Sequence, residues 1–141
     1  MNRFVLDTSF LLNLIRNTPA SQTLVAQLGI NEPGSLIILS VVSVAEIRVL
    51  ARRRNWGNPK LQKMEQVIAA AMVIDINLND DELLARYVDI DTSSQVLGRR
   101  MGKNDLWIAA TTMVANATLI TGDGDFDHLS GGIQIVKIPA N

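Results

Sequence analysis

The stretch Phe4-Val5-Leu6-Asp7-Thr8-Ser9 is a short apolar run that ends in an acid and two hydroxyl side chains. We expect residues 3–6 to form a buried β-strand, and a helix to follow with Thr8 or Ser9 as its N-cap. An unpaired carboxylate at the end of a buried strand is costly to desolvate. Asp7 could itself be the cap, but Thr8 or Ser9 can fill that position without a charge. We therefore interpret Asp7 as a functional residue.

Apolar runs and helical patterns alternate along the rest of the chain. We predict further strands at residues 36–42, 72–76, 118–121 and 133–138. We predict helices at residues 8–16, 19–29, 43–54, 60–71, 80–98 and 105–115. This alternation predicts an α/β fold, a mainly parallel sheet with helices on both faces.

Length and composition narrow the class of protein. The 141 residues fit one domain, residues 1–141, and no apolar run is long enough to cross a bilayer. Asp7 interrupts the first apolar run, so we do not expect a secretory signal. The chain has no cysteine and His128 is its one histidine, which argues against thiolate zinc sites, His-based metal clusters and Ser-His-Asp triads. We expect a cytoplasmic protein whose metal, if any, has oxygen ligands and is Mg²⁺ or Mn²⁺.

Four acidic residues stand where a parallel sheet would bring them together. Asp7, Glu46 and Asp123 each follow a predicted strand, and Asp105 opens a predicted helix. Ligands bind at the carboxyl edge of open parallel sheets. Carboxylates crowded there repel one another unless some are protonated or a divalent cation binds. The arrangement therefore predicts a metal site and, with it, hydrolysis.

Three of these acids also have purely structural interpretations, which remain open. Ser43-Val44-Ala45-Glu46 matches a capping box, in which the glutamate would bond the N–H of Ser43. Asn104 is a suitable N-cap and would leave Asp105 free to face the site. Asp123 lies between two glycines, as aspartates in ordinary turns often do.

These residues resemble the PIN-domain ribonucleases and, among them, the VapC-type toxins of toxin–antitoxin modules. The resemblance rests on residues 4–9, 43–46, 101–110 and 117–129. It implies a three-layer PIN-like fold with about five strands and the first strand central. It also implies that Asp7, Glu46, Asp105 and Asp123 are the catalytic, metal-binding acids. Residues implied to support them are Thr8, Ser9, Asn104 and Thr121, with Asp125 as an extra acid near the rim.

The resemblance further implies the activity and the partners. A metal-dependent endoribonuclease would hydrolyse RNA phosphodiester bonds with one or two Mg²⁺ or Mn²⁺ ions and leave 5′-phosphate and 3′-hydroxyl ends. A cognate antitoxin and a homodimer are expected. A non-catalytic RNA-binding or scaffold module on the same fold is the main alternative. A phosphatase with Asp7 as nucleophile fits less well, because Ser9 stands where its motif has a second acid.

The chain has a net charge of −1 but contains two groups of basic residues. Residues 48–63 hold six basic residues and no acid, and a second group lies at residues 99–103. Each group is either an ordinary solvated surface or a phosphate-binding patch. The second interpretation is considered because an acidic site needs flanking cations to hold RNA. The residues predicted to bind RNA are Arg48, Arg52, Arg99, Arg100 and Lys103.

Overall fold

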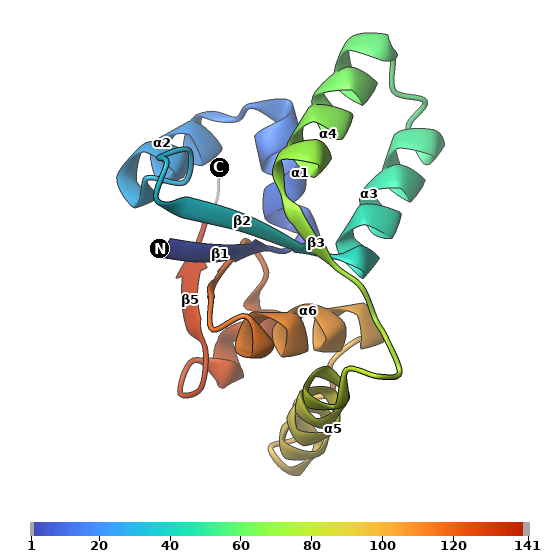
Figure 1. The fold of residues 1–141 in the computed structure, drawn as a ribbon, viewed down its shortest axis with the longest axis vertical. Coiled ribbons are helices and arrows are strands. Elements are labelled where there is room, and N and C mark those ends of the chain that lie inside the picture. The colour runs from blue at the N-terminus through green and yellow to red at the C-terminus, as the bar shows by residue number, and fades with distance from the viewer. Residues whose placement is uncertain (1, 140–141) are drawn as a thin grey trace.

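The computed structural model describes residues 2–139 and contains one five-stranded sheet (Figure 1). Every strand pairing is parallel, and the order is β3-β2-β1-β4-β5. The predicted parallel sheet with the first strand central is therefore confirmed. The strands are β1 (Asn2–Leu6), β2 (Ser35–Ser40), β3 (Met72–Ile74), β4 (Thr118–Thr121) and β5 (Gln134–Lys137).

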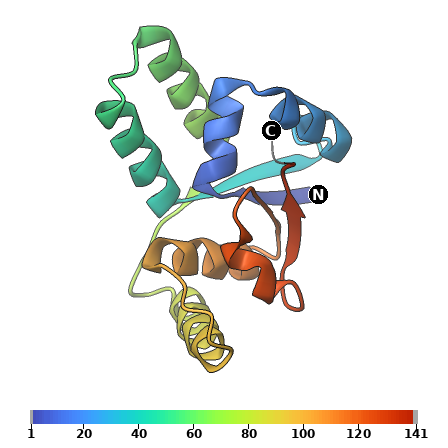
Figure 2. The same ribbon diagram turned by 180° about the vertical axis from the view of Figure 1, so that it is seen from behind.

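Helices cover both faces of the sheet, which gives the predicted three layers (Figures 1 and 2). One face carries α1 (Thr8–Arg16), α2 (Pro19–Leu28), α3 (Val41–Arg53) and α4 (Asn58–Ala70). The other carries α5 (Asp81–Val96), α6 (Lys103–Val114) and the short 3-10 helix η1 (Gly124–Leu129). None of the helices within residues 2–139 combines the length and the apolarity that crossing a membrane requires.

The central strand serves two hydrophobic cores. Phe4 and Leu6 pack among the residues of α1 to α4, whereas Val5 packs against α5 and α6. Successive side chains of a strand point to opposite faces, so a strand buried on both sides is apolar at every position. This burial explains the uninterrupted Phe4-Val5-Leu6 run and places the residue after it, Asp7, at the carboxyl edge of the sheet.

Three helices, α3, α4 and α6, each begin two residues earlier than their sequence patterns predict. Ser40, not Ser43, is the N-cap of α3, and its hydroxyl accepts a 3.3 Å hydrogen bond from the Val42 N–H. The capping-box interpretation of Glu46 is therefore wrong, because the helix begins at Val41, two residues before Ser43. Likewise Gly102, not Asn104, is the N-cap of α6. The α3 helix thus begins directly after β2 ends at Ser40.

Candidate active site

Asp7 is nearly fully buried and is the N-cap of α1. Its Oδ1 accepts hydrogen bonds from the Phe10 N–H at 2.9 Å and the Ser9 hydroxyl at 2.7 Å, and its Oδ2 accepts one from the Thr121 hydroxyl. The prediction that Thr8 or Ser9 caps this helix is wrong, because Asp7 still has extended backbone geometry and Thr8 is already helical. Burial raises the pKa of Asp7 despite these hydrogen bonds, and repulsion from Asp123 adds to the rise.

Two hydroxyl groups join β1 and α1 to the loop after β4. The Thr121 hydroxyl, which donates to Asp7, accepts a hydrogen bond from the Asp123 N–H at 2.9 Å. The Ser9 hydroxyl, which also donates to Asp7, accepts one from the Gly122 N–H at 3.0 Å. A Cβ on Gly122 would lie 3.0 Å from Ile138 Cγ2, so the chain passes here with little room for a side chain. The Asp7 carboxylate and the backbone of Asp123 are thus held in one network.

The Glu46 side chain is held by Thr8, the residue that follows Asp7. The Thr8 hydroxyl donates a 2.6 Å hydrogen bond to Oε1 of Glu46, and both side chains are half-buried. Because α3 begins at Val41, Glu46 lies in its second turn, and it reaches back to α1 rather than to its own helix end. Glu46 is therefore directed toward the same edge of the sheet as Asp7.

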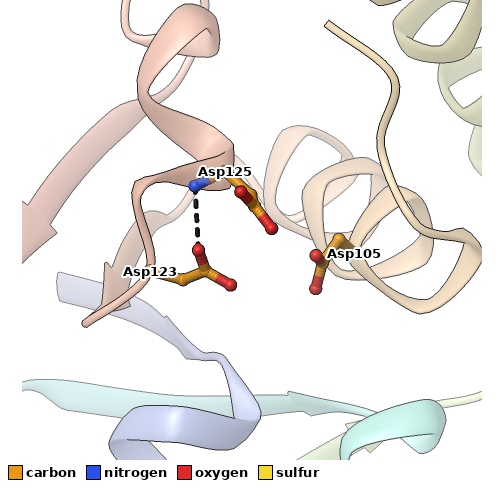
Figure 3. Close-up of side chains that lie close together, drawn as sticks. All are labelled: Asp105, Asp123 and Asp125. Atoms are coloured by element: carbon orange, nitrogen blue, oxygen red, sulfur yellow. Dashed lines mark hydrogen bonds between the residues drawn. The ribbon is translucent and has the colours of Figure 1, made fainter.

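Asp105, Asp123 and Asp125 form a three-carboxylate group, in which one oxygen from each residue lies within 4.8 Å of the others (Figure 3). Asp105 comes from the first turn of α6, and the other two flank Gly124 at the start of η1. Oδ1 of Asp123 accepts a 2.9 Å hydrogen bond from the Asp125 N–H, shown dashed in Figure 3. The sequence predicts Asp125 as an extra acid near the rim, whereas the structure places it in the three-carboxylate group. Its Asp-Gly-Asp spacing across a tight turn is the signal that could have placed it beside Asp123.

All five acids lie close enough to one another at this edge for their charges to interact. Burial raises the pKa of Asp105 to about 6, and the charges of Asp123, Asp125, Glu46 and Asp7 contribute in that order. Glu46 and Asp7 are not part of the group whose oxygens lie within 4.8 Å. The predicted acids are therefore brought together in two sets: Asp105 and Asp123 face Asp125 directly, and Asp7 and Glu46 border them.

The donor set of the three-carboxylate group fits a hard divalent cation. All its donors are carboxylate oxygens, which Mg²⁺, Mn²⁺ and Ca²⁺ prefer. Cation–oxygen distances of about 2.0–2.6 Å let one ion bridge oxygens that lie within 4.8 Å of one another. A cation would also relieve the repulsion that raises the pKa of Asp105.

The other predicted site residues lie outside this network. Asn104 is exposed, and no hydrogen bond of its side chain is found within residues 2–139. At about 100° per residue, Arg48 and Arg52 lie about 200° and 240° around α3 from Glu46. Arg48 approaches Glu65 of α4 at 3.5 Å. The second basic group is exposed and lies closer to Asp105 along the chain than Arg48 and Arg52 do; its residues are Arg99, Arg100 and Lys103. RNA binding by either basic group stays a prediction.

Comparison with known proteins agrees with this architecture. Ribonuclease VapC1 of Haemophilus influenzae strain R2866 is 27% identical over 122 residues, which cover 84% of each chain. VapBC2 from Rickettsia felis, solved bound to a DNA fragment from its promoter, has a TM-score of 0.80 at 19% identity and covers 97% of this chain and 99% of that one. VapBC-5 from Mycobacterium tuberculosis, a member of the VapBC family of toxin–antitoxin systems, has a TM-score of 0.67 at 26% identity and covers 99% and 100%. A family model described as PIN domain matches residues 4–132, so this chain belongs to the PIN domain family.

Proposed function

We propose that this chain is a VapC-type endoribonuclease that hydrolyses RNA phosphodiester bonds with one or two Mg²⁺ or Mn²⁺ ions. The observation that carries the proposal is the three-carboxylate group of Asp105, Asp123 and Asp125, bordered by Asp7 and Glu46. The similarity to a relative named Ribonuclease VapC1 supports RNA as the substrate. Membership of the PIN domain family supports the same class of reaction.

The five acids have three different parts in the proposed reaction. Asp105, Asp123 and Asp125 hold the cation through carboxylate oxygens. A divalent ion held there supplies the Lewis acidity that activates water near neutral pH and offsets charge on the phosphate. Asp7 accepts three hydrogen bonds, which leaves it one of about four acceptor sites for an ion or its water. Glu46, oriented by the Thr8 hydroxyl, positions the attacking water.

An antitoxin is the proposed regulatory partner. The similarity to VapBC-5 supports this, because that protein belongs to a family of toxin–antitoxin systems. A cavity of about 400 Å³ lies between α1, α2 and α4, with Leu14, Val25 and Val67 among its lining residues. Such a mixed apolar and polar hollow suits one face of an amphipathic helix. The expected homodimer stays a prediction.

Cleavage of total RNA by purified protein tests the proposed activity. Wild type is expected to cleave with Mn²⁺ and not with EDTA, and Asp105→Asn and Asp123→Asn are expected to lose cleavage. Asp127→Asn is the matched control, because Asp127 lies in the same loop but outside the three-carboxylate group. Equal cleavage by all four proteins would refute the proposal. RNA binding by wild type without any cleavage would instead favour the non-catalytic module.

A further inference from the structure

A basic residue, Lys137, lies at the end of the row of acids along the carboxyl edge of the sheet. Asp7 follows β1, Asp123 follows β4, and the last residue of β5, the strand beside β4, is Lys137. In the parallel register Lys137 pairs with Thr121, the residue whose hydroxyl donates to Asp7. Neighbouring strands lie about 4.8 Å apart. The backbone of Lys137 is therefore one strand spacing away from the strand that leads into Asp123.

The ammonium group of Lys137 lies on the loop that carries two of the three clustered carboxylates. Its Nζ is 3.3 Å from each carboxylate oxygen of Asp127. The same Nζ would be 3.7 Å from a Cβ placed on Gly124, which stands between Asp123 and Asp125. The Lys137 side chain is 45% exposed, so solvent, and any ligand arriving from solvent, can reach it.

A fixed cation near these acids would reduce their repulsion of RNA phosphates. The five carboxylates make the local electrostatic potential more negative, and a divalent ion offsets only part of their charge. Within residues 2–139, Lys137 is the one basic side chain that forms an ion pair with an acid of the loop 122–129. An ammonium has three donors, so Lys137 can contact Asp127 and still donate to a phosphate oxygen.

We propose that Lys137 binds a backbone phosphate of the RNA substrate beside the scissile one, while it also contacts Asp127. This inference rests on the proposed ribonuclease function and assigns one substrate contact within it. The competing role is purely structural, a clamp that fastens β5 to η1. The two roles differ in what Asp127 does: the clamp needs both partners equally, whereas phosphate binding needs only the cation.

Binding of a fluorescein-labelled single-stranded RNA, measured by anisotropy in EDTA over a series of KCl concentrations, separates these roles. Lys137→Gln is expected to weaken binding about 3–10-fold and to lower the salt slope by about one. Lys137→Arg is expected to keep both values, because it keeps the charge. Asp127→Asn is expected to bind RNA as wild type does or more tightly. In cleavage assays with Mn²⁺, Lys137→Gln should raise KM while kcat stays within about 3-fold.

Two results would overturn the inference: equal loss of RNA affinity in Lys137→Gln and Asp127→Asn, or wild-type affinity and salt slope in Lys137→Gln. Melting temperatures of all variants check folding, and the exposed pair is expected to contribute little to stability. Because binding is measured without metal, the result is independent of catalysis. A wild type that cleaves nothing refutes the ribonuclease proposal, whereas a lowered salt slope in Lys137→Gln would still support the phosphate contact.

Discussion

The Thr8 hydroxyl donates a 2.6 Å hydrogen bond to Oε1 of Glu46 and so joins the first turn of α1 to the second turn of α3 across 38 positions of sequence. Thr8 follows Asp7 directly, and Asp7 is the cap of the same helix. One dipeptide thus orients two of the acids that border the three-carboxylate group, Asp7 as a cap and Glu46 through a hydroxyl. The orientation of the Asp7 and Glu46 side chains therefore depends on where α1 begins.

Removing the Thr8 hydroxyl is expected to impair catalysis more than folding. Thr8→Val keeps the shape of the side chain but leaves Glu46 without its donor, which should lower the cleavage rate about 10–100-fold. The free energy of unfolding should fall by about 1 kcal/mol. Single-turnover cleavage and urea denaturation measure the two effects. Thr8→Ser retains the hydroxyl and serves as the control; a defect as large as that of Thr8→Val would contradict the assigned role.

Two substitutions of Asp7 should separate its cap from its charge. Asp7→Asn keeps a good N-cap and removes a charge that burial disfavours, so unfolding free energy should be unchanged or higher. Asp7→Ala loses the cap and leaves its donors unpaired, at a cost of about 1–3 kcal/mol. Both variants should lose about 100-fold or more of the cleavage rate. A strongly destabilised Asp7→Asn would show that the buried charge itself stabilises the fold.

The raised pKa of Asp105 predicts how stability depends on pH without metal. Its pKa is about 6 in the folded chain against an ordinary value of 3.8, so the folded state binds more protons between these values. The stability that this group contributes is present below about pH 4 and is lost as the pH rises to about 6. Urea denaturation in EDTA from pH 4 to 7 should therefore show a steeper fall for wild type than for Asp105→Asn. Parallel curves would rule out this assignment.

Mn²⁺ is expected to stabilise the protein through the three-carboxylate group. Binding to the folded state alone adds about 2.7 kcal/mol at a concentration 100 times Kd. Asp125→Asn removes one of the three acids and should weaken Mn²⁺ binding at least 10-fold, seen as a smaller rise in Tm. Asp127→Asn should keep the wild-type rise, and EDTA should reverse it. If Asp125→Asn retains the full rise, Asp125 is not part of the metal site.

The true start of α3 can be tested with two serines. Ser40 caps the helix, so Ser40→Ala should cost about 1 kcal/mol of unfolding free energy. The buried Ser43 hydroxyl has no hydrogen-bond partner within residues 2–139, so Ser43→Ala should be neutral or stabilising by up to about 1 kcal/mol. Urea denaturation compares the two variants. A capping box at Ser43 would reverse their order.

Local patterns were enough to locate most strands and helices and to identify the acids as candidates. The Phe4-Val5-Leu6 run, the Thr18-Pro19 start of α2 and the Gly29 end of that helix all follow from side-chain polarity and backbone preference. The exact starts of α3, α4 and α6 did not follow, because several neighbouring residues are acceptable caps and the local pattern does not select among them. Glu46 consequently lies in the second turn of α3 rather than in a capping box.

Side-chain polarity along the chain is enough to predict a parallel sheet covered on both faces, with carboxylates at its edge, because burial on both faces demands apolar strands and leaves charges at the strand ends. Which groups meet at that edge is known from the folded chain alone: Thr8 with Glu46, Thr121 with Asp7, and Asp125 with Asp105. Such contacts depend on crossover geometry and on tenths of an ångström in side-chain placement. No local periodicity encodes these distances, since they arise only when remote segments pack.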